Sequence, residues 1–444
     1  MQKYQKELLI SGKKIGVWGV GYIGFSTMAH FAAEDVSCLG YDVAHDRVDS
    51  VNHGEIYIPG LQYWLGFETK PLVDNNLMRA TTNYRELLNA DVLVHFICIP
   101  TEKEGKPFWD YLKDVLVKIS EIKRSKQLLP PLVIIESTLT PGISEKIVLP
   151  TLKKHGIKIG KNLLLGVAPR RDWFVERKKS LRELDRVYGA TDSRTSKEIE
   201  GVLSIVCAKL HAAPDHRIAE MVKSIENAYR HMEITLANQL TLAYPDIDMR
   251  EVLRLVGTKW NVGTYQPSFG TGGYCIPLSS QYVIEGAKKP EELTLLKSTI
   301  KTDRDMPRSV ARAMKRAGCK KVGILGLSYR GNLKVQVLSP AIAITKNLKK
   351  LGIGVKVYDP FYTDSEIKHF LGVPTFQFPE NLDQFDGLLV VADHKEFTTT
   401  HVHQKLWSLK RCKLILDNTA IWKDLEFSSK GIEYHVAGEE KWLG

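Results

Sequence analysis

The segment that most constrains the fold is a glycine-rich turn between a buried strand and a helix. The run "KKIGVWGVGYIG" at residues 13–24 ends an apolar strand with Gly19, Gly21 and Gly24 in G-x-G-x-x-G spacing. A helix-forming stretch follows, and the next strand, "VSCLGYD", ends in Asp42. In such a βαβ unit the first glycine makes the tight turn, the second lets a pyrophosphate approach the helix N-terminus, and the third lets helix and strand pack closely. The acid would bind ribose hydroxyls and repel a 2′-phosphate, so the pattern predicts an NAD site rather than an NADP site.

Further apolar strands continue this α/β pattern. They are "DVLVHFICIPT" (91–101), "PLVIIESTLTPG" (131–142) and "NLLLGVAPRR" (162–171). In doubly wound sheets the carboxyl ends of the strands face the ligand crevice, although hydroxylated residues there also serve as local hydrogen-bonding groups. The expected cofactor-binding residues are Gly19, Gly21, Tyr22, Ile23, Gly24, Asp42, Arg47, Thr101, Ser137 and Thr138.

A proline-free stretch between Pro214 and Pro245 predicts one long helix of about 30 residues. Along it, polar residues recur at i, i+3, i+7 and i+10 and therefore share one face: Glu220, Lys223, Asn227 and Arg230. Such a stripe is either the solvated side of an amphipathic helix or a functional face. A helix of this length typically connects domains or forms a dimer seam.

Buried-strand patterns resume after residue 319, as "KKVGILGLSYRG" (320–331), "GVKVYDP" (354–360), "GLLVVADH" (387–394) and "CKLILDNTA" (412–420). This half has a degenerate glycine turn. The predicted fold class is α/β, with two Rossmann-like doubly wound domains joined by a long central helix. We expect domains at residues 1–208 (NAD binding), 209–305 (central helical and dimerisation region) and 306–444 (second Rossmann-like domain).

The segment "PSFGTGGYCIPLSS" (267–280) places Cys275 after three glycines, Gly270, Gly272 and Gly273. Consecutive N–H groups in such a loop can form an anion-attracting nest beside which a thiol becomes reactive. A small buried cysteine after a turn is the alternative. None of the six cysteines has C-x-x-C spacing, so neither a disulfide framework nor a metal site is expected.

Composition narrows the class of protein. The chain is 43% hydrophobic and 25% charged, lacks an apolar run of membrane-spanning length, and has no signal-peptide pattern at its start, so a cytoplasmic protein without a membrane partner is expected. The net charge of +11 comes without a nucleic-acid-binding motif, and we expect no nucleic-acid partner.

The ordered motifs resemble the UDP-glucose/GDP-mannose dehydrogenase family over nearly the whole chain. They are "GVGYIG", "CIPT", "ESTLTPG", "EMVKSIENAYR", "FGTGGYCIP", "GLSYRGN" with "SP" at 339–340, "YDP" and "ADHKEF". "GGYCIP" is most similar to the branch acting on UDP-N-acetylated hexosamines.

The resemblance implies a two-step, NAD-dependent oxidation of the sugar C6 alcohol to a carboxylate. Cys275 would capture the C6 aldehyde as a thiohemiacetal, Lys223 would act as acid–base or electrostatic group, and Asn227 would orient the oxyanion or a water molecule. A nucleotide-sugar substrate bound by the domain at residues 306–444 and a homodimer through the central helix are also implied. The implied substrate-binding residues are Arg170, Lys223, Asn227, Phe269, Gly270, Gly272, Gly273, Tyr329 and Arg330.

The chain departs from the family pattern at several sites. Arg170 and Ser279 replace a glutamate and an aspartate implicated in activating water; Asp172 or Glu176 could supply a carboxylate instead. In "GLSYRGNLKVQVLSP", Arg330 replaces a lysine, Lys334 and Val335 replace two acids, and Val337 replaces an arginine. Two alternatives therefore stand beside the complete dehydrogenase: a two-electron oxidoreductase that stops at the aldehyde or takes an unusual sugar, and a non-catalytic homologue that binds NAD or a nucleotide-sugar.

Overall fold

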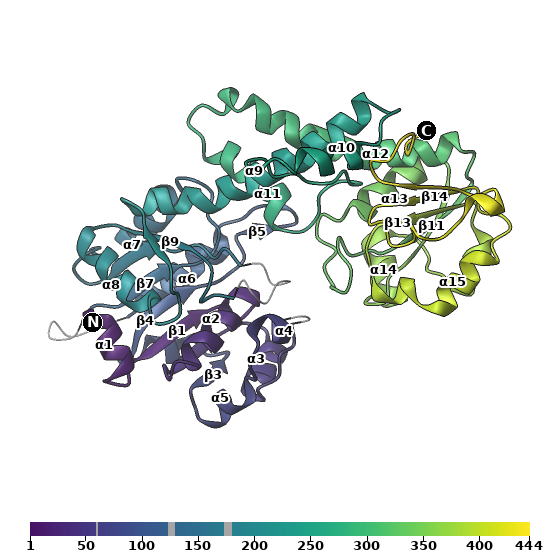
Figure 1. Cartoon of the computed structure of the whole chain (residues 1–444). Coiled ribbons are helices and arrows are strands. Elements are labelled where there is room, and N and C mark those ends of the chain that lie inside the picture. The colour runs from purple at the N-terminus through teal and green to yellow at the C-terminus, as the bar shows by residue number, and fades with distance from the viewer. Residues whose placement is uncertain (59–60, 123–128, 173–179) are drawn as a thin grey trace. The chain divides into compact units, whose positions relative to one another are not determined.

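The computed structural model describes residues 1–58, 61–122, 129–172 and 180–444. The chain divides into two compact units, which are described separately (Figure 1). The first contains Met1–Glu226 and Glu285–Lys288, and the second contains Asn227–Ile284 and Lys289–Gly444. The three domain boundaries expected from the sequence stay a prediction.

The first unit is built on an eight-stranded sheet in the order β10-β9-β8-β7-β4-β1-β2-β3. Its strands are β1 (Lys14–Trp18), β2 (Cys38–Tyr41), β3 (Met78–Thr81), β4 (Val92–Ile97), β7 (Leu132–Ile135), β8 (Leu164–Val167), β9 (Arg186–Ala190) and β10 (Leu210–Ala212). All paired strands are parallel except β8 and β9. Strands β2 and β3 lie on one side of β1, whereas β4, β7 and β8 lie on the other. The strand order therefore reverses at β1, the point at which doubly wound sheets bind ligands.

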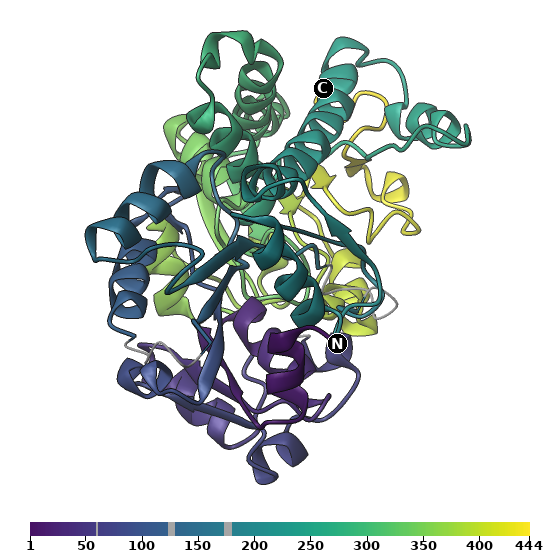
Figure 2. The same cartoon turned by 90° about the vertical axis from the view of Figure 1, so that its left-hand side faces the viewer.

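Helices cover both faces of this sheet (Figures 1 and 2). On β7, Leu132 and Ile134 pack in one apolar cluster, and Val133 and Ile135 pack in another. The first cluster includes residues of α1 (Lys3–Leu9), α2 (Tyr22–Ala32) and α8 (Ser193–Leu203), and the second includes residues of α6 (Asp110–Ser120) and α7 (Leu149–Lys154). The continuous apolar runs of the sequence are thus explained by burial on both faces.

The long helix α9 (His216–Ala243) has 28 residues, close to the expected length, and the boundary between the units falls within it. In the second unit, α10 (Met249–Val256), α11 (Cys275–Gly286) and α12 (Thr294–Arg316) follow. None of the helices in the described part of the chain combines the length and apolar character that a membrane span requires.

The second unit contains a five-stranded parallel sheet in the order β12-β11-β13-β14-β15. Its strands are β11 (Lys321–Leu325), β12 (Gly354–Tyr358), β13 (Gly387–Val390), β14 (Leu414–Asp417) and β15 (Glu433–Val436), with helices α13 (Pro340–Lys350), α14 (Asp364–Leu371) and α15 (Thr400–Trp407). After β11, Gly326 makes the turn at φ +99°. Asp359, which follows β12, accepts hydrogen bonds from the amides of Leu327 and Ser328, the two residues after Gly326, at 2.8 and 2.9 Å. The prediction of two Rossmann-like sheets and a central helix is confirmed.

Candidate active site

The glycine turn after β1 has the geometry of a dinucleotide cradle. Gly19 has φ +90°, a backbone conformation that favours glycine. A Cβ on Gly24 would lie 1.8 Å from the Gly19 carbonyl oxygen, so only glycine lets α2 start so close to the strand. A Cβ on Gly21 would meet no atom within 4 Å, and Gly21 is the N-cap of α2. The open side of the turn at a helix N-terminus therefore fits a pyrophosphate.

Asp42 lies directly after β2 and is tied to this turn. One carboxylate oxygen accepts the Val20 amide at 2.9 Å and the other accepts the Ala44 amide at 3.0 Å. The Arg47 guanidinium lies 3.7 Å from the same carboxylate. Two backbone donors fix the orientation of the acid, and a carboxylate retains further acceptor sites for ribose hydroxyls.

Replacing Asp42 with alanine is expected to raise the KM for NAD about tenfold or more, because hydrogen bonds to a charged group contribute about 1.5–3 kcal/mol. The preference for NAD over NADP should fall as well, since the charge that repels a 2′-phosphate is gone. Initial rates with both cofactors measure the two effects. Asp46→Ala, an exposed acid on α3 (His45–Asn52), is the control. Unchanged cofactor constants in the Asp42 variant would contradict the assignment.

The other expected cofactor residues lie at the strand ends or on the first helical turns. Thr101 donates to the Thr138 carbonyl at 2.7 Å, and Ser137 donates to the Ile99 carbonyl at 2.8 Å. These bonds join the ends of the neighbouring strands β4 and β7. Tyr22 and Ile23 form the first turn of α2 and are partly buried. Binding of NAD by these five residues stays a prediction.

Lys223 lies on α9 between two residues that fasten this helix to the loop after β7. Glu220 accepts the amides of Ile143 and Ser144 at 2.8 and 3.1 Å, and Ser224 donates to the Leu139 carbonyl at 3.0 Å. Among the described residues, no carboxylate lies within ion-pair distance of Lys223, which is half-buried. These bonds thus fix the part of α9 that carries Lys223.

The buried carboxyl group of Glu220 predicts that the free energy of unfolding of the first unit depends on pH. Burial raises the pKa of Glu220 from 4.5 to about 7, even though backbone amides donate to the carboxylate. An acid whose pKa is higher in the folded state stabilises the fold below its unfolded pKa and loses that stabilisation as pH rises through the folded value. The unfolding free energy of the wild type should therefore fall between about pH 4.5 and 7 relative to Glu220→Gln, by roughly 3 kcal/mol at 1.36 kcal/mol per pKa unit. Chemical denaturation of both proteins at pH 5 and 8 measures the difference, and a pH-independent difference would refute it.

Asn227, Ser279 and Cys275 are brought together in the second unit. The Asn227 side chain donates to the Ser279 hydroxyl at 3.1 Å, and Ser279 donates to the Cys275 carbonyl at 2.6 Å. Cys275 is the first residue of α11 and is exposed, whereas the other five cysteines are buried. The alternative of a buried structural cysteine is therefore excluded. Ser279, which replaces the usual aspartate, joins the long helix to the backbone of the candidate nucleophile.

Tyr329 packs so closely against the loop before Cys275 that Gly272 and Gly273 leave no room for a side chain. A Cβ on Gly272 would lie 2.4 Å from the Tyr329 Cβ, and one on Gly273 would lie 2.9 Å from its ring. Gly273 also has φ +83°. Burial raises the pKa of the Tyr329 phenol, and the nearby Cys275 side chain raises it further. The aromatic ring thus covers the glycine loop close to the thiol.

The remaining expected substrate contacts differ in their exposure. Gly270 has φ +129°, and Arg330 is exposed. Phe269 is fully buried, and its ring stacks on Trp442 with centroids 5.8 Å apart. Its side chain belongs to the core of the second unit, so any ligand contact there must come from its backbone. The substrate contacts as a whole stay a prediction.

Arg170 is buried rather than lining an open crevice. It lies 2.7 Å from a carboxylate oxygen of Asp172 and 3.6 Å from one of Glu136, and it donates to Ser26 on α2 at 2.8 Å. Glu136 also pairs with the buried Arg186. The Asp172 carboxylate, which the sequence offered as a replacement water activator, is instead paired with the Arg170 guanidinium. Glu176 lies outside the described residues.

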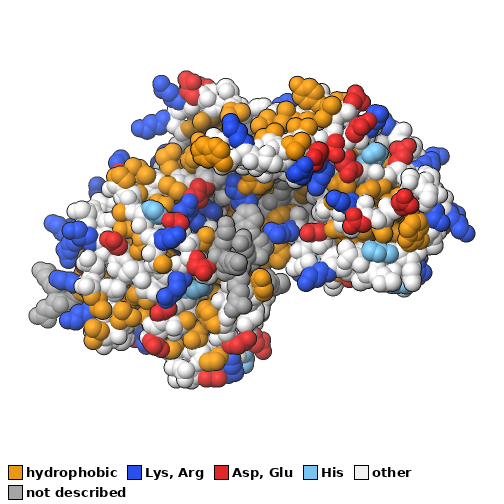
Figure 3. All heavy atoms as spheres, in the orientation of Figure 1, with side chains coloured by type: hydrophobic (Ala, Val, Ile, Leu, Met, Phe, Trp, Pro, Cys, Tyr) orange, Lys and Arg blue, Asp and Glu red, His pale blue; other side chains and the backbone are white. Residues whose placement is uncertain are grey.

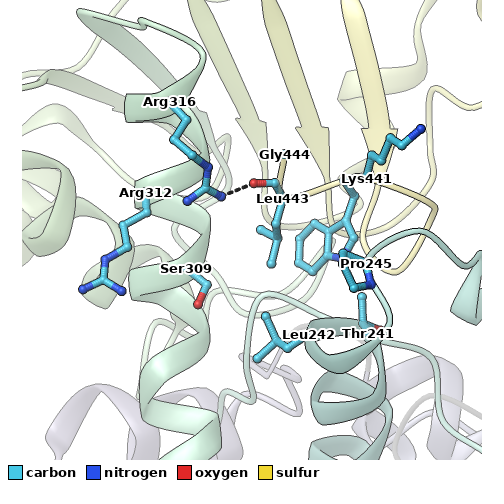
Figure 4. A pocket seen from close by; sticks show the side chains of 10 residues that line it. Thr241, Leu242, Pro245, Ser309, Arg312, Arg316, Lys441, Leu443 and Gly444 are labelled. Carbon is cyan, nitrogen blue, oxygen red and sulfur yellow. Dashed lines mark hydrogen bonds between the residues drawn. The ribbon is translucent and has the colours of Figure 1, made fainter.

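A cavity of about 300 Å³ in the second unit contains none of the predicted site residues (Figure 4). Arg316 donates to the Leu443 carbonyl there, and the side chains of Arg312 and Lys441 extend in opposite directions away from Leu443. The predicted site at Cys275 is therefore separate from this cavity. Its lining residues are Thr241, Leu242, Pro245, Ser309, Arg312, Arg316, Lys441, Trp442, Leu443 and Gly444.

Models of a single protein family match most of the chain. Three models of the UDP-glucose/GDP-mannose dehydrogenase family match: the NAD-binding domain at residues 13–206, the central domain at 217–305 and the UDP-binding domain at 323–424. The chain belongs to this family. The predicted resemblance, the NAD cofactor, the nucleotide-sugar partner and the identity as an NAD-dependent nucleotide-sugar dehydrogenase are confirmed, and the two alternative functions are not favoured.

Individual relatives of the dehydrogenase family extend the comparison. The UDP-N-acetyl-D-mannosamine dehydrogenase of Methanococcus aeolicus is 29% identical, with 96% of this chain and 95% of that protein covered. The UDP-N-acetyl-D-glucosamine 6-dehydrogenase of Pseudomonas aeruginosa is 24% identical, with 86% and 91% covered. The solved structure of the UDP-D-ManNAc dehydrogenase of Pyrococcus horikoshii is 25% identical with a TM-score of 0.83, covering 96% of this chain and 100% of that one.

Proposed function

We propose that the protein oxidises the C6 hydroxymethyl group of a UDP-linked N-acetylhexosamine to a carboxylate through a thioester on Cys275. The substrate class is that of the mannosamine and glucosamine dehydrogenases to which the chain is similar. The observation that carries the mechanism is the single exposed thiol at the start of α11, next to a glycine loop and linked through Ser279 to Asn227.

The residues divide the reaction into two oxidations. The Gly19–Gly24 turn and Asp42 would hold NAD, which when bound would supply the hydride acceptor for both oxidations. Lys223, which has no carboxylate within ion-pair distance among the described residues, stabilises the developing oxyanion on C6. Cys275 then adds to the aldehyde, forming a carbon–sulfur bond, and the thiohemiacetal is oxidised to a thioester. Water cleaves the carbon–sulfur bond and frees the thiol. In balance, RCH2OH, two NAD and one water give RCOO⁻, two NADH and three protons.

Neither residue at the usual carboxylate positions acts as the water-activating base in this proposal. The Arg170 guanidinium is bound by Asp172, Glu136 and Ser26 within the first unit. The Ser279 hydroxyl is bonded on both sides, to Asn227 and to the Cys275 carbonyl. We assign Asn227 to orient the water and Lys223 to accept and release protons at the C6 oxygen.

The NADH yield tests the function. The protein is incubated with excess NAD and limiting UDP-N-acetylmannosamine, UDP-N-acetylglucosamine, UDP-glucose or GDP-mannose, and NADH absorbance and product mass are recorded. Two NADH per sugar and a mass gain of about 14 Da for at least one UDP-N-acetylhexosamine are expected, as the four-electron oxidation requires. One NADH per sugar with an aldehyde product would contradict the thioester route, and turnover confined to GDP-mannose would contradict the substrate class.

We further propose a homodimer through the central helix. Apolar side chains are exposed on α9 and α10 of the second unit, and hydrophobic groups gather on the surface over α10 (Figure 3). They include Tyr229, which is 61% exposed, Leu236, Leu255 and Val256. Exposed apolar patches of this kind support association. Sedimentation of the wild type and of Leu236→Glu tests the proposal; a wild-type monomer would overturn it.

We also propose a cytoplasmic location. All six cysteines are free thiols, as expected of a protein kept in a reducing compartment. Cell fractionation with an antibody against the protein tests it, and recovery in an extracytoplasmic fraction would refute it.

A further inference from the structure

Three elements of the second unit, α9, α11 and α12, meet at His231. His231 lies on α9, one turn after Asn227, and is 1% exposed. Its Nδ1 lies 2.9 Å from the Oγ of Ser280 on α11, and its Nε2 lies 3.4 Å from an oxygen of Asp303 on α12. The imidazole therefore contacts both the helix that begins at Cys275 and the helix that carries Asp303.

Asp303 in turn holds the loop that leads to Cys275. Its carboxylate accepts the Thr271 backbone amide at 2.7 Å and the Thr271 hydroxyl at 2.6 Å. Thr271 lies between Gly270 and Gly272, and glycines leave the backbone free to rotate. Two hydrogen bonds to one fixed carboxylate restrict both the backbone and the side chain at the centre of this loop.

The carboxylate of Asp303 is itself fixed, because its side chain is only 11% exposed. Among the described residues, no lysine or arginine lies within ion-pair distance of it, and His231 is the one group there that can carry a positive charge. A largely buried carboxylate needs such partners, since each hydrogen bond lost leaves desolvated charge uncompensated. The two hydrogen bonds from Thr271 therefore hold Asp303 in one orientation, and the His231 imidazole packs beside it, its Nε2 making no hydrogen bond among the described residues.

We propose that Asp303 and His231 are positioning residues for Cys275. Asp303 anchors the glycine loop through Thr271, and His231, which is hydrogen-bonded to Ser280 on α11, packs against the Asp303 carboxylate at 3.4 Å. This link is separate from the Asn227–Ser279 contact one helical turn earlier. The inference rests on the proposed function for the role of Cys275, but the anchoring of the loop can be measured without turnover.

Amide hydrogen exchange tests the anchor directly. In Asp303→Ala, exchange of the peptide covering residues 267–274 should accelerate about tenfold or more, because a buried hydrogen bond to a charged acceptor is lost. The matched control is Asp305→Ala on the same helix, whose carboxylate pairs with Lys301 and Arg308 instead of the loop. Exchange of the β13 peptide should stay unchanged in both variants and reports that the unit is folded.

Kinetics then separate positioning from binding. In Asp303→Ala, kcat should fall roughly 10–100-fold while the KM values for NAD and nucleotide-sugar change less than threefold, as expected when a catalytic group is displaced. Asp303→Asn keeps one acceptor for the Thr271 amide and should recover part of the loss. His231→Gln, which keeps a polar group, should lie between the wild type and His231→Ala.

The outcomes separate this inference from the proposed function. Equal loop exchange in the Asp303 and Asp305 variants would overturn the anchor. Faster exchange throughout the unit in Asp303→Ala would overturn positioning in favour of a purely structural role. A wild type without turnover would contradict the proposed function, while the loop exchange would still decide whether Asp303 holds the loop.

Discussion

Replacing Cys275 with serine is expected to lower carboxylate formation by roughly a thousandfold or more, because a serine hydroxyl without an adjacent base is a far weaker nucleophile than a cysteine sulfur. Without the covalent adduct, the aldehyde cannot enter the second oxidation by this route. The NADH yield per sugar should fall from two to one at most. The KM for NAD should change less than twofold, since Cys275 is not among the residues expected to bind the cofactor.

Two measurements check that the effect belongs to this thiol. Iodoacetamide should label the wild type once and the Cys275→Ser variant not at all, because the other five cysteines are buried. Cys412→Ser, at a buried position in the second unit, should retain carboxylate formation if it folds. Unchanged acid production by Cys275→Ser would exclude a thioester and assign the second oxidation to a hydrated aldehyde.

The parts of the fold that were predictable depend on contacts close in sequence. The turn at Gly19 to Gly24 and the acid at Asp42 lie within one βαβ unit, so their spacing alone predicts that they lie together at the end of β1 and β2. The helix α9 was bounded by two prolines and begins and ends within two residues of them. Cys275 could be singled out because its three glycines precede it directly.

The parts that were missed depend on contacts between distant segments. Asp303 contacts Thr271 across 32 residues, and His231 contacts Ser280 across 49. No periodicity within one helix reveals such pairs, although His231 continues the polar face of α9 one turn beyond Asn227. Arg170 was expected beside the substrate because of its place in a family motif; its partners Glu136 and Ser26 come from other strands and helices, so its burial could not be read locally.

Replacing Arg170 with glutamate, the residue that the family pattern has there, is expected to destabilise the first unit rather than to create a base. The cluster holds two cations, Arg170 and Arg186, against Glu136 and Asp172, and all four side chains are at most 3% exposed. The variant would place three carboxylates against Arg186 alone. Breaking a buried pair costs about 3–5 kcal/mol. For a unit of this size that corresponds to a fall in Tm of roughly 10 °C or more.

Calorimetry of the Arg170→Glu variant measures the effect, with Arg182→Glu as the matched control. Arg182 pairs with Glu34 at the surface and is 58% exposed, so the same change of charge should cost about 1 kcal/mol or less. Arg170→Met, which leaves Asp172 without its partner, should also be strongly destabilised. A folded Arg170→Glu protein with the wild-type Tm and faster thioester hydrolysis would contradict the buried network, because Arg170 would then have to face the reacting atoms. That result would indicate that residue 170 faces the ligand crevice, as its place in the family motif predicts.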